Sequence, residues 1–108
     1  MAVTVTYSDL VIGFPIPDKL RKKMEKLGAE PRITALTTPE GYDTYDAVLT
    51  AELGDKEYEM SDSLLCEERD ALDTLSDDGV NHDTSAIEDV EWGSDTVYLY
   101  FRDIGYDV

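Results

Sequence analysis

The sequence predicts an α+β fold, in which two helices pack on one face of a mostly antiparallel sheet of about five to six strands. Two stretches, residues 18–28 and 61–78, carry apolar residues at helical spacing. Around them lie short alternating runs separated by Gly, Pro and Asp, which is typical of strands and turns. The expected order is β-α-β-β-β-α-β-β, and helices this well defined disfavour a barrel. At 108 residues, the chain is expected to form one acidic domain, 1–108.

The N-terminal part is expected to hold one strand and one helix. Residues 2–8 alternate with strand spacing, and the apolar run 10–14 continues that strand after a bend. Prolines end the run, and Pro17 suits a first helical position. Gly28 closes the helix. The face of this helix opposite its apolar side carries four lysines: Lys19, Lys22, Lys23 and Lys26.

The lysine-rich helix face is interpreted as a solvated surface rather than a nucleic-acid or membrane site. A further alternative is that it offsets the acidic remainder of the chain, within one molecule or across a dimer. Residues 1–36 hold six basic and four acidic side chains, a net charge of +2. Residues 37–108 hold three basic and 21 acidic ones, a net charge of −18.

The middle of the chain is expected to form strands joined by turns. Residues 32–38 alternate as a strand, and a second strand spans residues 44–53. Gly54 and Asp55 form a two-residue hairpin turn, because Gly supplies the positive φ that such turns need. The returning strand, residues 56–60, places Tyr58 and Met60 on one face.

An acidic helix is expected over residues 61–78, SDSLLCEERDALDTLSDD. On a helical wheel one arc is apolar: Leu64, Leu65, Ala71, Leu72 and Leu75. The opposite arc carries carboxylates: Asp62, Glu67, Asp70, Asp73, Asp77 and Asp78. Glu68 falls within the apolar arc. It is expected to pair with one of three arginines, Arg32, Arg69 or Arg102, with a place in an interface as the alternative.

The C-terminal part is expected to return to strands after a polar loop at residues 80–86. Residues 87–92 and 96–102 are strand candidates joined by a turn. In the second, Val97, Leu99 and Phe101 face one way, and Tyr98 and Tyr100 the other. The tyrosines are interpreted as packing under helices, and the tail 104–108 as fraying or packing Tyr106.

No catalytic, metal or cofactor motif is found in the sequence. His82 is the one histidine, in a polar loop, and Cys66 is the one cysteine, beside carboxylates that would raise a thiol pKa. One of each is too few for a zinc site. An EF-hand alignment on Gly79 puts Thr74 and Ser85 where acidic ligands are needed. Phosphate-binding glycine motifs are also missing. We therefore expect a non-enzymatic protein with no cofactor.

Composition limits the partners. The net charge of −16 repels nucleic acid and anionic membranes, and the same field attracts a basic partner. The chain has no run of membrane-spanning length and no signal-peptide pattern, and a lone cysteine fits a reducing compartment. A cytoplasmic location is expected, in the host cell if a phage encodes the protein.

The leading functional hypothesis is an inhibitor whose acidic face occupies the nucleic-acid-binding surface of a basic protein. In size, charge and acidic-helix pattern, the chain resembles DNA mimics that phages and mobile elements make against restriction or CRISPR systems. Six outward carboxylates over about 24 Å are less than half as dense as the roughly 14 charges of a duplex of that length. The expected partner-binding residues are therefore drawn from the helix and its flanks: Asp62, Glu67, Asp70, Asp73, Asp77, Asp78, Asp83, Glu88, Asp89 and Glu91.

Two alternatives stay open. One is an immunity protein or antitoxin that neutralises a basic toxin or nuclease. The other is a structural or housekeeping domain of a salt-loving organism or its virus, in which acidity adapts the entire surface to salt. The clustering of lysines on one helix disfavours the second alternative, because a halophilic surface is acidic throughout.

Overall fold

The structure is a computed structural model that describes residues 4–7, 9–38, 46–75 and 81–107. These residues form eight strands, two α-helices and one short 3-10 helix, η1. The elements follow in the order β1 (Thr4–Tyr7), β2 (Val11–Pro15), α1 (Asp18–Leu27), β3 (Arg32–Thr37), β4 (Asp46–Leu53), β5 (Lys56–Ser63), α2 (Cys66–Asp73), η1 (Thr84–Ala86), β6 (Ile87–Trp92), β7 (Thr96–Phe101) and β8 (Ile104–Asp107). The predicted α+β class, with two helices and antiparallel strands, is confirmed.

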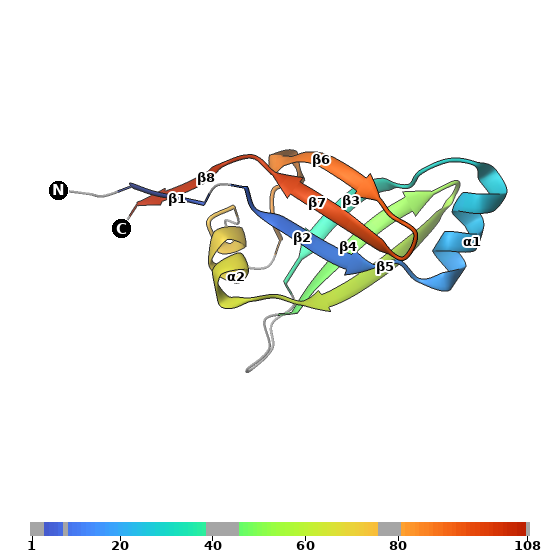
Figure 1. Cartoon of the computed structure of the whole chain (residues 1–108), viewed down its shortest axis with the longest axis horizontal. Coiled ribbons are helices and arrows are strands. Elements are labelled where there is room, and N and C mark those ends of the chain that lie inside the picture. Colours follow the sequence, from blue (N-terminus) through green and yellow to red (C-terminus); the bar gives the residue numbers. More distant parts are fainter. Residues whose placement is uncertain (1–3, 8, 39–45, 76–80, 108) are drawn as a thin grey trace.

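The strands pair into three antiparallel sheets rather than one. Two sheets have three strands, in the orders β2-β7-β6 and β3-β4-β5, and the third pairs β1 with β8. In Figure 1 the two three-stranded sheets lie one over the other, and the β1–β8 ribbon extends from one end. Inward residues of both sheets, such as Phe14, Leu49 and Leu99, belong to one buried cluster. The core therefore lies between the two sheets.

The sequence suggested two helices on one face of a sheet, but the helices lie at opposite ends of the two-sheet core. Figure 1 shows α1 beyond the β4–β5 turn and α2 at the end from which the β1–β8 ribbon leaves. The molecule measures 55 × 28 × 21 Å. Because the two sheets bury each other's inner faces, no wide apolar sheet face is left for a pair of helices to cover. Each helix instead covers one end of the core.

The first predicted strand is two strands. β1 ends at Tyr7 and β2 begins at Val11, and between them Asp9 takes a left-handed conformation with φ of 57°. Aspartate tolerates that conformation better than most residues, but it interrupts an extended strand. As a result β1 leaves the sandwich and pairs with β8, Val5 opposite Tyr106. The tail that was expected to fray or pack Tyr106 is thus a paired strand.

Helix α1 is confirmed where the sequence places it. Pro17 precedes it in an extended conformation, and the buried side chain of Leu20 anchors it to the core. Gly28 ends it with φ of 62°, and its backbone N–H donates to the Met24 carbonyl at 2.8 Å. Only glycine adopts this left-handed capping conformation at little cost.

The strands of the β4–β5 hairpin are also as predicted, but β5 is longer than expected. Gly54 has φ of 69° in the turn, and Leu49 pairs with Met60 in register. Pairing continues to Ser63 opposite Asp46, where the Ser63 hydroxyl donates to the Asp46 carboxylate at 2.9 Å. Residues 61–63, which the sequence predicts to be the start of the acidic helix, are therefore paired with β4 as part of β5.

Helix α2 is consequently much shorter than predicted, Cys66–Asp73 instead of 61–78. Leu64, Ala71 and Leu72 are buried as the helical wheel predicted, and Leu75 packs partly against the core. Leu65 is the exception, because it precedes the helix and its side chain is 72% exposed. The C-terminal end of the predicted helix, residues 76–78 with Asp77 and Asp78, lies outside the described residues.

Strands β6 and β7 are confirmed, with Val97, Leu99 and Phe101 buried. Tyr98 is 40% exposed on the outer side of its sheet, so the expectation that both tyrosines pack under helices is wrong. Neither helix covers that face, because each lies at an end of the sandwich. None of the helices in the described part of the chain is long and apolar enough to cross a membrane.

We expect Phe14→Ala to lower the free energy of unfolding by about 3–5 kcal/mol, because the side chain is fully buried between the sheets. The matched control is Val11→Ala on the same strand, where the side chain is 40% exposed and the loss should stay under about 1 kcal/mol. Urea unfolding followed by circular dichroism measures both. Equal losses in the two variants would contradict a core between the sheets.

Candidate functional site

The acidic residues of α2 face solvent at one end of the molecule. Glu67 and Asp70 are exposed, and among the described residues neither has an ion-pair partner. Eight residues of helix span about 12 Å, over which a DNA duplex carries about seven charges. With Asp73, the helix offers three exposed carboxylates over that length. The charge density of the helix is therefore less than half that of a duplex, as the sequence suggested. The helix is, however, only half as long as expected.

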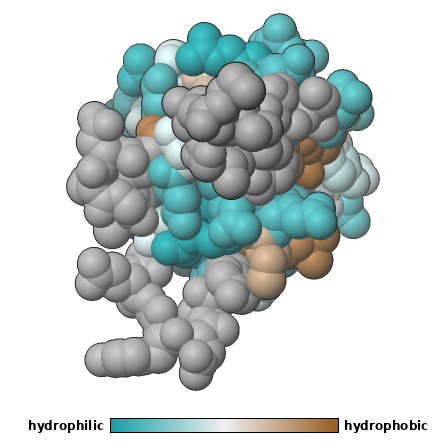
Figure 2. Space-filling model, turned by 90° about the vertical axis from the view of Figure 1, so that its left-hand side faces the viewer, coloured by the Kyte–Doolittle hydropathy of each residue, from teal (hydrophilic) through white to brown (hydrophobic). Residues whose placement is uncertain are grey.

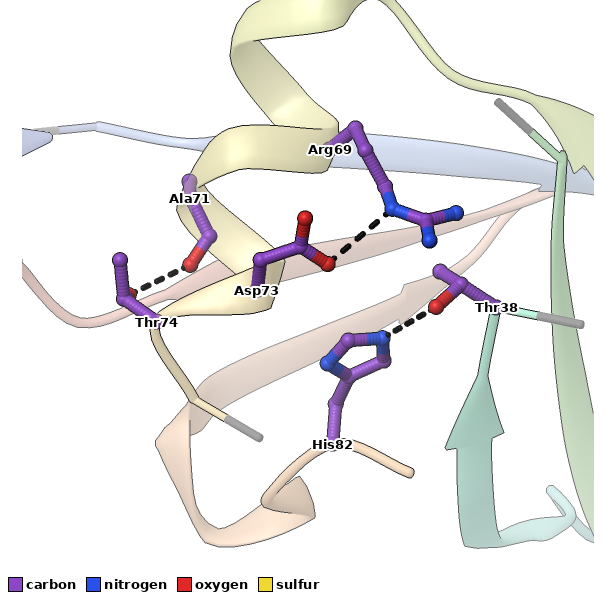
Figure 3. Close-up of polar contacts among 6 residues, drawn as sticks. All are labelled: Thr38, Arg69, Ala71, Asp73, Thr74 and His82. Atoms are coloured by element: carbon purple, nitrogen blue, oxygen red, sulfur yellow. Dashed lines mark hydrogen bonds and ion pairs between the residues drawn. The ribbon is translucent and has the colours of Figure 1, made fainter. Parts of the chain in front are cut away.

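Asp73 is not a free carboxylate. Its Oδ1 accepts a hydrogen bond from Nε of Arg69 at 3.0 Å, one turn earlier in the helix (Figure 3). The Arg69 side chain is only 20% exposed, whereas that of Asp73 is 45% exposed. Such i,i+4 pairs on a helix surface contribute a few tenths of a kcal/mol to stability. The main effect of the pair is therefore to neutralise part of the negative charge of α2.

Among the described residues Glu68 forms no ion pair with an arginine, so that expectation is wrong, while its alternative place in an interface stays a prediction. Its Oε1 accepts the backbone N–H of Leu65 at 2.8 Å. This is one half of a capping box, in which an acidic residue in the first turn satisfies a backbone donor at the helix start. The late start of α2 puts Glu68 in that turn, where a carboxylate also favours the positive end of the helix dipole.

Asp62 belongs to β5 and not to the helix. It is exposed, and its Oδ1 accepts the backbone N–H of the next residue, Ser63, at 2.8 Å. Asp62 therefore lies beside the start of α2 but is oriented by a strand end. If Asp62 belongs to an interaction surface, the β5 strand positions it there and not the helix that the sequence predicted.

The segment 81–83 links α2 back to the sandwich. The His82 backbone N–H donates to the Leu36 carbonyl at 3.0 Å, and the Asp83 N–H donates to the Leu75 carbonyl at 3.3 Å. His82 is buried, and its Nε2 lies 2.9 Å from the hydroxyl of Thr38, which is fully buried (Figure 3). The sequence prediction of a histidine in a polar loop missed this role, because the contact joins residues 44 positions apart.

Asp83 caps η1 and is held in its charged form. Its Oδ1 accepts the Ser85 backbone N–H at 2.9 Å. Hydrogen bonds from the Ser85 side chain and backbone, together with the charge of Arg102, hold the pKa of Asp83 below its ordinary value of 3.8. A lowered folded-state pKa stabilises the folded protein above about pH 4, and this contribution is lost as the pH falls through the folded pKa.

Strand β6 carries three further predicted residues, all exposed: Glu88, Asp89 and Glu91. The register with β7 shifts between Ile87 and Asp89, so Glu88 lies in an irregular part of the ladder. Asp89 and Glu91 are the Cα partners of Tyr100 and Tyr98. The Tyr100 hydroxyl donates to Oε2 of Glu91 at 3.0 Å, and this bond raises the pKa of Tyr100.

Basic side chains are concentrated at the other end of the molecule. The four lysines of the lysine-rich face are on α1, which lies opposite α2 along the long axis (Figure 1). The ion pairs of the described residues are all made by arginines: Arg21 with Asp18, Arg32 with Glu52, and Arg69 with Asp73. The lysines of α1 therefore do not neutralise the carboxylates of α2 within one molecule.

Figure 2 looks at the end of the molecule on the left of Figure 1, where α2 lies. Most of its described surface is hydrophilic, with smaller hydrophobic areas. In the described part of the chain, no three His, Cys, Asp or Glu side chains gather in a way that would hold a metal ion. A shallow depression beside α1, lined by Ile16, Arg21 and Met24 among others, contains none of the predicted site residues.

The predicted residues thus follow a path along the chain rather than one helix face. The hydrogen bond from the Asp83 backbone N–H to the Leu75 carbonyl places Asp83 near the C-terminal end of α2. From Asp83 the chain continues through η1 into β6. The structure separates Asp62 from the helix, and Asp77 and Asp78 lie outside the described residues. Tyr98 of β7, which was expected to pack under a helix, is exposed beside this path as the Cα partner of Glu91. Its alternation with Val97 and Leu99 in the sequence is the signal that it faces away from the core.

No protein-family model matches the sequence, and no curated protein or solved structure matches it significantly.

We expect Ser85→Ala to raise the pKa of Asp83 towards 3.8, because the largest cause of its lowered value is the hydrogen bond from the Ser85 side chain. A carboxyl carbon NMR titration measures the shift. Ser94→Ala, at another exposed serine, is the control and should leave the Asp83 pKa unchanged. An unaltered Asp83 pKa in Ser85→Ala would show that the Ser85 hydroxyl does not donate to the Asp83 carboxylate.

Proposed function

We propose that this protein is a non-enzymatic inhibitor or binding protein whose acidic surface occupies the nucleic-acid-binding surface of a basic protein. The observation that carries the proposal is the separation of charge along the molecule. Exposed carboxylates of α2, such as Glu67 and Asp70, have no basic neighbour paired with them in the described residues, while the lysines lie on α1 at the far end.

Unneutralised carboxylates at one end have a physical consequence for association. They create a negative potential that steers a basic protein to that end and accelerates encounter at low ionic strength. The same potential repels DNA and RNA, because their phosphates carry like charge. A surface of this kind fits lysine and arginine side chains that otherwise hold phosphates.

The structure changes which residues support the proposal. The helix supplies three exposed carboxylates, so it does not reproduce the phosphate spacing of a duplex alone. Asp83 and the exposed carboxylates of β6 extend the acidic surface along the chain. Inhibition of the anti-restriction or anti-CRISPR type would use this composite surface, with phosphate surrogates drawn from helix, cap and strand.

The first test is capture from a host lysate at moderate salt, followed by competition with DNA or RNA. Enrichment of one nucleic-acid-binding protein that added nucleic acid displaces would support the proposal. If no specific partner is captured and the protein folds only in molar salt, the salt-adapted alternative is favoured instead.

A charge-reversal pair tests which end of the molecule binds. We expect Glu67→Lys with Asp70→Lys to weaken capture by about tenfold or more, because both side chains are exposed at the acidic end. The matched control reverses two exposed carboxylates at the α1 end, Glu25→Lys with Glu30→Lys, and changes the net charge equally. Equal weakening in both would mean that only overall charge matters, against a localised acidic surface. Circular dichroism checks that each variant is folded.

A further inference from the structure

The outer face of the β2–β7–β6 sheet carries an exposed aromatic and acidic surface that helices do not cover. In antiparallel pairs, residues that are Cα partners project from the same side of the sheet. Tyr98 has Gly13 and Glu91 as its partners on the two sides, and Tyr100 has Val11 and Asp89. Alternate residues of β2 and β7 are buried, so these six residues face outward.

Tyr98 is exposed, and its ring lies beside two glycines. A Cβ added at Gly13 would lie 3.3 Å from Cδ1 and Cε1 of the Tyr98 ring. One added at Gly93 would lie 3.9 Å from Cε2, on the other edge. The ring therefore lies between two positions that have no side chain, and 40% of the residue remains exposed. A tyrosine offers a large contact area and has only two side-chain torsions, so ordering it on binding costs little side-chain entropy.

The carboxylates beside the tyrosines are also oriented. Oε2 of Glu91 accepts the Tyr100 hydroxyl at 3.0 Å, and Oδ1 of Asp89 accepts the Val90 backbone N–H at 2.9 Å. β2, β6 and β7 contain no lysine or arginine. Arg102, which follows β7, lies near Asp83, whose pKa it helps to lower. Two carboxylates and an aromatic ring are thus placed together without a cation on the three strands.

This combination matches a guanidinium group better than an ammonium group. Arginine stacks its planar head on an aromatic face and pairs with carboxylates at the same time, whereas lysine is a compact, strongly hydrated point charge. Exposed valine beside the tyrosines adds apolar contact for the aliphatic stem of such a side chain. Surfaces enriched in tyrosine are also typical of protein–protein interfaces.

We propose that the outer face of β2, β7 and β6 docks an arginine-bearing segment of a basic protein, with a guanidinium stacked on Tyr98 and paired with Glu91 and Asp89. The inference rests on the proposed function for the basic character of the partner, and it adds the face and the side chain that are recognised. The α2 end attracts the partner at long range, and this sheet face makes the close contact.

The test uses two synthetic peptides, octa-arginine and octa-lysine, titrated into the isotope-labelled full chain at physiological salt and followed by NMR. We expect octa-arginine to bind more tightly, with the largest shifts at Tyr98, Tyr100 and Val11. Tyr98→Ala should weaken octa-arginine binding by roughly two- to thirty-fold, and Tyr98→Phe should retain most of it because the ring remains. Equal affinity for both peptides, or unchanged binding in Tyr98→Ala, would overturn the inference.

Two double variants that remove the same charge test which carboxylates bind the peptide. Asp89→Asn with Glu91→Gln should weaken octa-arginine binding more than Glu57→Gln with Glu59→Gln, which removes the same charge from exposed positions on β5. Equal effects would assign the binding to net charge and overturn the assigned face.

A natural partner captured equally well by wild type and Tyr98→Ala would also overturn the inference, while the proposed function would stand. Absence of any captured partner, with octa-arginine still bound at Tyr98, would instead contradict the proposed function alone.

Discussion

The two three-stranded sheets bury their inner faces against each other, and the other features of the molecule depend on that contact. Phe14, Leu49 and Leu99 are fully buried in the cluster between the sheets. Burying such side chains is the main favourable term in folding, and here it acts against the self-repulsion of a chain with a net charge of −16. Because the inner faces are satisfied, the helices close the ends of the core, and the outer sheet faces remain open to solvent.

This architecture decides how the charge is presented. The lysine-rich helix and the acidic helix cover opposite ends of the two-sheet core, and the ion pairs of the described residues include none between them. Some carboxylates have structural tasks: Glu68 caps α2, and Asp83 caps η1. Others, such as Glu67, have no such task and are exposed. The contacts of the carboxylates therefore distinguish those that support the fold from those that the proposed function assigns to a partner.

The proposed partner surface combines two properties, and each resides in a different element of the fold. The exposed carboxylates of α2 act at a distance, since their field extends over a Debye length of about 8 Å at physiological salt. The tyrosines of β7 act only on contact, and the glycines beside Tyr98 leave room for its ring. Charge alone would attract many basic proteins. An oriented ring beside two carboxylates adds a preference among cations, which is how an acidic protein gains specificity.

The sequence by itself determined the α+β class, the α1 helix with its glycine cap, the β4–β5 hairpin, and the alternation of β6 and β7. These follow from periodicity, propensity and turn chemistry within a few neighbouring residues. Only the tertiary structure decided that residues 61–63 extend β5, since their pairing partner is Asp46 on another strand. It likewise decided the burial of His82 against Thr38, and it left the outer sheet face that carries Tyr98 without a helix over it. Pairing and burial depend on residues distant in the chain, and no local pattern contains that information.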